Sequence, residues 1–211
     1  MEEVMKNRGL RRITWWIVMF GIVALFIGCS STPKVSRVDT DTTIDVSGRW
    51  NDADSRMVSD EMIQDCLDNP WLERFRTSNK GKPPTIVVGM VRNKSHEHIN
   101  VETFMKDLER ALINSGRVQF VASKGERGSI RDERLDMAKH ASEDTMKGPG
   151  EEVGADFMLI GSINTIRDEA GGTAVMYYQV DLELINMANN IKAWIGQKKI
   201  KKVIQRSKLK W

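Results

Sequence analysis

The chain has 211 residues and a mass of 24.0 kDa, and its 32 lysines and arginines against 29 acidic residues give a formal charge of +3. This length suits one globular core with appendages, since a domain averages roughly 150 residues. The near balance of charge argues against a nucleic-acid coating protein and against an acidic disordered chain. The 2 cysteines and 3 histidines are too few for a disulfide framework and leave little for a structural zinc site.

The N-terminal segment has the pattern of a signal peptide. Four basic residues among the first 12 precede an apolar run without charge over residues 13–27. A basic region followed by such a run is typical of a secretory signal, and the run is shorter than the ~20 residues that cross a bilayer. We therefore expect a segment that is cleaved or serves as an anchor, rather than one that spans the membrane.

The end of this run resembles a bacterial lipobox. The segment reads Leu25-Phe26-Ile27-Gly28-Cys29, with Phe26 at the position that usually holds leucine. The resemblance implies that the chain is cut after Gly28 and that Cys29 carries the lipid. Ser30, in place of aspartate, resembles the pattern of lipoproteins sorted to the outer membrane. The alternative is an uncleaved N-terminal anchor helix.

The rest of the chain divides by composition and charge. Residues 29–46 are rich in Ser, Thr and Asp and are predicted to form a flexible tether. Residues 29–191 carry 20 bases and 27 acids, a balance of −7, whereas residues 192–211 carry 8 bases and no acid. Such a basic end is either a solvated tail or a surface for a polyanion, an acidic protein patch or a membrane. We expect one α+β domain over residues 47–205 and a basic tail over residues 206–211.

Hydrophobic periodicity predicts the elements of this domain. A helix begins at Asp54 or Ser55 and ends at Leu67, with Pro70 as its breaker. Apolar residues that alternate with polar ones, or that follow one another in a run, predict strands, and apolar residues at 3.6-residue spacing predict helices. Gly171-Gly172 predicts a hairpin turn. The expected elements are a strand at 85–91, a helix at 101–114, a strand at 118–122, a helix at 126–141, and strands at 157–166, 174–186 and 191–204. This order, β-α-β-α-β-β-β, describes a mixed sheet that ends in an antiparallel meander and is flanked by helices.

No catalytic motif emerges from the sequence. His96 and His98 have the spacing of a metal-chelating pair, but no third ligand is identifiable, so a polar loop is the preferred interpretation. Nucleophile motifs and phosphate-binding glycine loops are missing from the sequence. Val58, Met62 and Cys66 recur at four-residue spacing, which predicts that Cys66 is a small buried side chain. We expect no enzyme, no metal and no cofactor.

Long, ordered segments carry a resemblance to a known family. They are SGRWND at 47–52, PWL at 70–72, GMVRNKSHEHINVETFMKDLERALINSGRVQFVAS at 89–123, GADFMLIGSINTI at 154–166, YYQVDLEL at 177–184, and WIG at 194–196 followed by KKIKK at 198–202. Together they resemble the LpoB family, outer-membrane lipoprotein activators of bifunctional penicillin-binding proteins. The resemblance implies a non-catalytic, monomeric periplasmic domain, similar in fold to the N-terminal domain of TolB, that docks on a peptidoglycan synthase and stimulates it. The alternative is a structural or secretion-associated envelope lipoprotein related to CsgG-type assembly components.

Two segments are candidates for docking on the synthase. The first is the turn after the first strand, with Arg92, Asn93, Glu97 and His98. The second is the basic last strand, with Lys199 and Lys201. For the turn, a purely structural role is the alternative, since Asn93 and Asn100 suit turn and cap positions. The aromatic residues Trp50, Trp71, Tyr177, Tyr178 and Trp194 are expected in the core or half-buried on the sheet.

Overall fold

The computed structural model describes residues 35–147, 150 and 152–205. Contacts divide the chain into two units, Met1–Thr40 and Asp41–Trp211. Of the first unit, residues 35–40 are described and contain no helix or strand. The predicted signal peptide, Cys29 and the basic tail at 206–211 lie outside the described residues. Within the described ranges, no helix has the length and apolar character needed to cross a bilayer.

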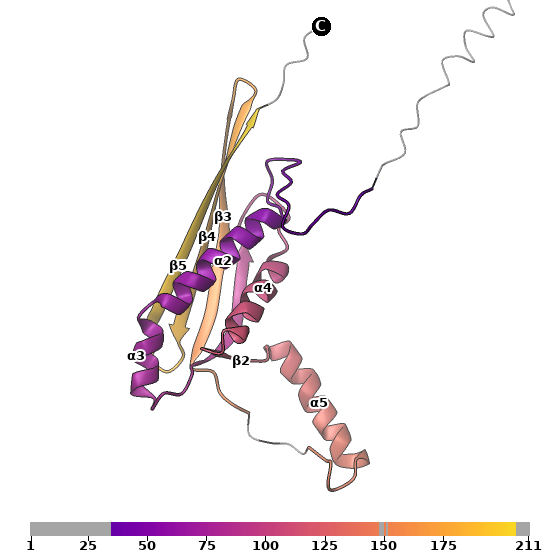
Figure 1. The fold of residues 1–211 in the computed structure, drawn as a ribbon. Coiled ribbons are helices and arrows are strands. Elements are labelled where there is room, and N and C mark those ends of the chain that lie inside the picture. The colour runs from indigo at the N-terminus through magenta and orange to yellow at the C-terminus, as the bar shows by residue number, and fades with distance from the viewer. Residues whose placement is uncertain (1–34, 148–149, 151, 206–211) are drawn as a thin grey trace, which may run out of the picture. The chain divides into compact units, whose positions relative to one another are not determined.

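The second unit is built on a five-stranded mixed sheet, drawn in Figure 1. Its strands are β1 (Thr85–Asn93), β2 (Gln119–Val121), β3 (Phe157–Ala170), β4 (Thr173–Asn186) and β5 (Lys192–Gln205), in the order β2-β1-β3-β4-β5. β1 pairs in parallel with β2 and with β3, whereas β3, β4 and β5 form an antiparallel meander. The predicted α+β class with a mixed sheet is therefore confirmed.

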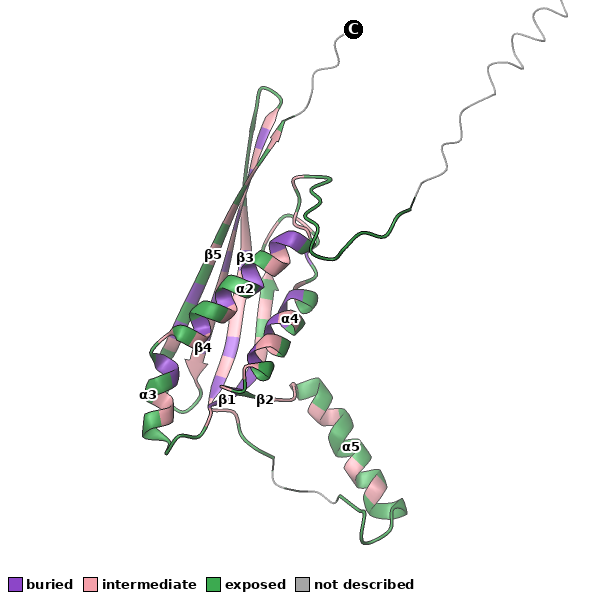
Figure 2. Cartoon of the chain, in the orientation of Figure 1, coloured by how far each residue is buried: buried purple, intermediate pink, exposed green. Residues whose placement is uncertain are grey.

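Helices cover one face of this sheet. They are α2 (Asp52–Asp68), α3 (Trp71–Ser78) and α4 (Val101–Asn114). A further helix, α5 (Lys124–His140), contributes no residue to the core. In Figure 1, α2 and α4 lie side by side on the same side of the strands. The two faces of the sheet differ most clearly along β4. Its even-numbered residues from Ala174 to Leu184 are buried and the odd-numbered ones between them are half-buried, as Figure 2 shows. Successive strand residues point to opposite faces, so only the even-numbered side meets the helices.

The core joins the amphipathic stripes of the helices to this inward face of the sheet. α4 supplies Phe104, Met105, Leu108 and Leu112, which recur at helical spacing. α2 supplies Val58, Met62 and Cys66, and α3 supplies Trp71 and Leu72. The sheet contributes Ile86, Phe157, Leu159, Ile163, Met176, Tyr178, Val180, Leu182, Leu184 and Trp194. No outward-pointing residue of β3, β4 or β5 belongs to this buried cluster.

Local capping explains where the helices begin. The side chain of Asn51 accepts a hydrogen bond from the Asp54 amide, and the Asp54 carboxylate accepts one from the Asn51 amide, which is a capping box for α2. Asn100 caps α4 through the Glu102 amide, as its position in the sequence predicts. These caps satisfy amide groups that have no partner within the helix.

The structure adds one helix to the predicted elements and lengthens the third strand. Pro70 ends α2 as expected, but it also precedes the short helix α3, because proline fits the first turn of a helix and Trp71 and Leu72 are buried there. β3 continues to Ala170, beyond its expected end at residue 166. Gly171 and Gly172 have φ of 59° and 82°, the left-handed values that a tight hairpin requires, so pairing extends to the turn itself.

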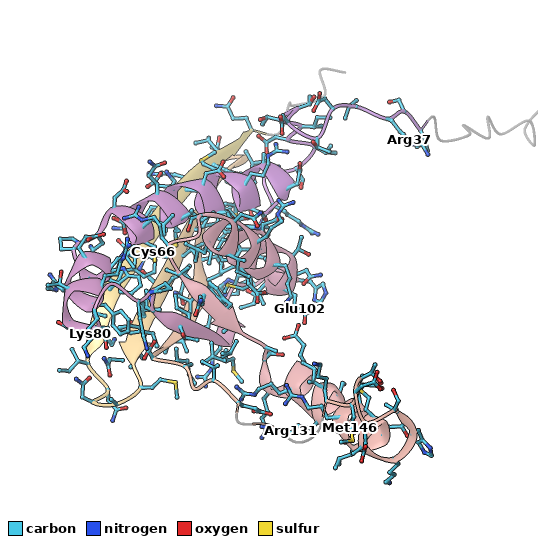
Figure 3. The ribbon with its side chains drawn as sticks, turned by 60° about the horizontal axis from the view of Figure 1, so that its bottom comes forward. Arg37, Cys66, Lys80, Glu102, Arg131 and Met146 are labelled. Carbon is cyan, nitrogen blue, oxygen red and sulfur yellow. The ribbon has the colours of Figure 1, made fainter. Side chains whose placement is uncertain are left out.

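α5 is a surface helix, as its weak amphipathicity predicts. None of its residues is buried, and Figure 3 shows side chains, among them Arg131, projecting from this helix. A capping box of Ser123 and Glu126 starts it, and Arg131 donates two hydrogen bonds of 2.7 Å each to the Glu152 carboxylate. Its stability therefore comes from local capping and ion pairs rather than from the core.

Candidate partner-binding surface

The turn that follows β1 is organised by Asn93. Its side-chain oxygen accepts a 2.9 Å hydrogen bond from the Ser95 amide, and its side-chain nitrogen donates a 2.8 Å bond to the Glu97 carbonyl. Both bonds are local and form the turn, and docking by Asn93 stays a prediction. Arg92 and His98, in contrast, are exposed.

Glu97 links three distant parts of the chain. Its carboxylate accepts a 2.9 Å hydrogen bond from the Trp50 amide and another of 2.9 Å from the Tyr178 hydroxyl. Burial and the neighbouring Glu97 carboxylate raise the pKa of Tyr178 above its ordinary value, which keeps the hydroxyl protonated as a donor. The Tyr178 and Trp50 rings also meet edge to face at 5.5 Å. Glu97 thus holds the entry to α2 against β4.

The basic last strand divides its lysines between two faces. Lys199 and Lys201 are exposed, whereas Lys198 and Lys202 point to the helix side of the sheet. Lys198 pairs with Glu61 on α2. Since successive strand residues face opposite ways, one run of basic residues serves two environments.

Lys202 is the centre of a polar cluster at the start of the domain. Its ammonium lies 2.7 Å from the Asp54 carboxylate and 2.9 Å from that of Asp45, and it donates a 3.1 Å bond to the Arg49 carbonyl. Burial alone would lower the pKa of Lys202, but the hydrogen bonds to Asp54 and Asp45 outweigh it and raise that pKa. This cluster fastens residues 45–54 to β5, and sequence reasoning missed it.

The strand register places Arg92 and the exposed lysines on one surface. Arg92 pairs in register with Ser162, Ser162 with Asp181, and Asp181 with Gln197. Lys199 and Lys201 follow Gln197 at two-residue steps and so share its face. This outward face of β1, β3, β4 and β5, opposite the helix-covered core, is called the open face below. Arg92, Lys199 and Lys201 all lie on the open face. Asn93 instead forms hydrogen bonds within the turn after β1, and Glu97 accepts one from Trp50 just before α2.

A shallow hollow of about 300 Å³ lies on the open face. Its lining combines Met90, Arg92 and Lys94 with Asp181 and Glu183 of β4. The register of β1 against β3 shifts between Val88 and Val91, which marks a β-bulge over residues 89–90. A bulge of this kind redirects side chains, and here it brings Met90 and Arg92 to the rim of the hollow.

The described residues hold no group of three or more His, Cys, Asp and Glu side chains that could bind a metal ion. His96 is exposed, and its Nδ1 lies 3.2 Å from the Thr165 hydroxyl. Burial raises the pKa of the Cys66 thiol to about 12, so this side chain is an unreactive part of the core, as predicted. The aromatic residues are also placed as expected, with Trp71, Tyr178 and Trp194 buried and Trp50 and Tyr177 half-buried.

A comparison with protein families matches residues 54–200 to the family described as "Peptidoglycan-synthase activator LpoB". The chain belongs to the LpoB family. The match covers the sheet from β1 to most of β5 and begins inside α2. The family is one of activators rather than of catalysts.

Solved structures also match the chain, at low sequence identity. The C-terminal domain of LpoB from Salmonella enterica is 18% identical, covers 70% of this chain and 98% of its own, and has a TM-score of 0.33. LpoB from E. coli, solved by NMR, is 15% identical, with coverage of 84% and 85% and a TM-score of 0.34. The lipoprotein GNA1162 from Neisseria meningitidis is 14% identical, with coverage of 60% and 88% and a TM-score of 0.36. Curated protein sequences contain no match.

Proposed function

We propose that this protein is a lipid-anchored periplasmic regulator that binds a bifunctional penicillin-binding protein and stimulates its synthesis of peptidoglycan. The match of residues 54–200 to the LpoB family carries the proposal. An activator needs a stable domain with a recognition surface and no catalytic groups of its own. The domain at 47–205 has an extensive core on one side of its sheet and an open face on the other.

Stimulation would act through a population shift in the synthase. At saturation, a protein that binds the active conformation of an enzyme more tightly than the inactive one raises the ratio of active to inactive enzyme by the ratio of its two affinities. The regulator therefore contributes binding energy only, and its residues do not need to reach the reacting atoms.

The test is the rate of glycan polymerisation by the purified synthase in detergent, with and without the chain lacking residues 1–29. We expect the rate to rise with added protein and to saturate at one molecule of this protein per synthase. Sedimentation of the protein alone should show a monomer. Heat-denatured protein serves as the control. The proposal would be refuted if the protein neither bound nor stimulated any synthase from the same cell.

The anchor is proposed from Cys29, which lies outside the described residues. Lipidation predicts that the full chain fractionates with the outer membrane, because several acyl chains make attachment effectively permanent. The wild-type chain should then take up labelled palmitate and lose residues 1–28, whereas the Cys29→Ala variant should stay unlabelled. A wild-type chain that takes up no label and keeps its first 28 residues would show an uncleaved anchor helix instead.

A further inference from the structure

The open face carries four basic side chains that have no carboxylate partner within the described part of the chain. Arg92 and Lys94 lie at the β1 side, and Lys199 and Lys201 lie on β5. β1 and β5 are separated by β3 and β4, so the two pairs stand roughly 14 Å apart. The other lysines of the same segment, Lys198 and Lys202, are neutralised by acids on the helix side. Among the described lysines of β5, Lys199 and Lys201 therefore have charges that another molecule can pair with.

The acidic side chains of the open face are largely engaged. Glu183 pairs with Lys192 at 2.7 Å. The Asp181 carboxylate accepts hydrogen bonds from the side-chain amides of Gln179 and Gln197, at 2.9 and 2.7 Å. Five bases, Arg92, Lys94, Lys192, Lys199 and Lys201, stand against three acids, Asp168, Asp181 and Glu183, a balance of +2 on a body that is otherwise acidic.

Large apolar side chains accompany these charges. Met90 and Ile166 are each 65% exposed, Val203 61% and Ile195 57%. Scattered exposed apolar residues are ordinary on a surface, but here all four share one face with the unpaired bases. Apolar anchors beside charged groups are the composition of a protein interface rather than of a solvated surface.

We propose that the open face is the docking surface and that its occupant is an acidic face of the synthase. This step rests on the proposed function and adds to it the location and the chemistry of the contact. A second copy of the chain is a poor occupant, because two open faces would bring like charges together. The apolar side chains add contact area that an acidic protein surface can cover and that a purely electrostatic ligand would leave exposed.

The experiment reverses charge on the open face and at a matched site elsewhere. Lys199→Glu/Lys201→Glu changes two exposed bases of β5, and Lys80→Glu/Lys82→Glu makes the same change of charge in the exposed loop before β1. Each full-length protein, purified in detergent, is titrated against the detergent-solubilised synthase at 50 and 200 mM salt. Co-sedimentation of the same variants lacking residues 1–29, without detergent, with vesicles containing anionic lipid forms a separate arm, because this form carries no acyl chain.

We expect the β5 variant to bind the synthase at least tenfold more weakly than wild type and to lose most of the dependence on salt, with the loop variant unchanged. Met90→Ser/Ile166→Ser should weaken binding while its salt dependence stays that of wild type. Circular dichroism checks that each variant is folded.

Three outcomes would overturn the proposal, in different ways. If wild type and the β5 variant bind the synthase equally, the open face is not the docking surface, although the proposed function stands. If the β5 variant loses vesicle binding alone, the face serves an anionic membrane. If wild type binds no synthase, the proposed function and this surface fall together.

Discussion

Replacing Lys202 with methionine tests whether the polar cluster at the start of the domain stabilises the fold. Asp54 is only 4% exposed at its side chain and Lys202 14%, so the ion pair of 2.7 Å is shielded from water. Removing one partner of a fully buried pair costs ~3–5 kcal/mol, because the remaining charge is left without compensation. Asp54 keeps its bond from the Asn51 amide, and water reaches the site of Lys202 in part. We therefore expect a loss of about 2–3 kcal/mol in the free energy of unfolding.

Urea denaturation of the chain lacking residues 1–29 measures this loss as a lower midpoint at unchanged slope. Lys198→Met is the matched control, since Glu61 is 54% exposed and such surface pairs contribute ~0–1 kcal/mol. Combining Lys202→Met with Asp54→Asn removes both charges and should recover much of the stability. Equal losses for the two lysine variants, or a double variant as unstable as the sum of its singles, would refute the reasoning.

Three further predictions concern the core, the thiol and the Glu97 link. Phe104→Ala, at a side chain 1% exposed, should cost ~3–5 kcal/mol in urea denaturation, whereas Ile113→Ala, at 45% exposed, should cost less than ~0.5. Because the pKa of Cys66 rises from 9.0 in the unfolded chain to about 12 in the fold, the unfolded state alone loses this proton above pH 9. Stability should fall by ~1.4 kcal/mol per pH unit there, and Cys66→Ala should show a correspondingly flatter slope between pH 8 and 10. Glu97→Ala should cost ~1–2 kcal/mol, since the Trp50 amide loses its acceptor and the Tyr178 hydroxyl keeps the Gly48 carbonyl at 3.2 Å; an unchanged melting temperature would contradict this.

The sequence predicts most of the secondary structure because each element carries its own periodic pattern. The helix at 101–114 has an apolar stripe and a cap within 15 residues, and the structure begins and ends it at the predicted positions. α3 was missed because eight residues hold too few turns to show a period, and its helical state depends on burying Trp71 and Leu72. The bulge over residues 89–90 has no local signal either, since it appears only when β1 pairs with β3.

The polar contacts were less predictable, because they join residues far apart in the chain. Glu97 and Tyr178 are 81 residues apart, and Lys202 and Asp45 are 157 apart. Composition marks such residues only as charged or polar, and pairing follows from the fold. For the same reason Glu97 could be taken for a docking residue, whereas two of its hydrogen bonds tie it to the interior.

The alternation of β5 explains how one charged segment can serve both the fold and a partner. A basic run on a helix would spread its charges around the axis, but a strand sends them to two faces at a period of two. On the helix side, Lys198 and Lys202 meet Glu61, Asp45 and Asp54 and stabilise the domain. On the open face, Lys199 and Lys201 remain available. A shift of β5 by one residue against β4 would exchange the two sets, so the register that pairs Gln179 with Lys199 also keeps Lys199 and Lys201 on the open face.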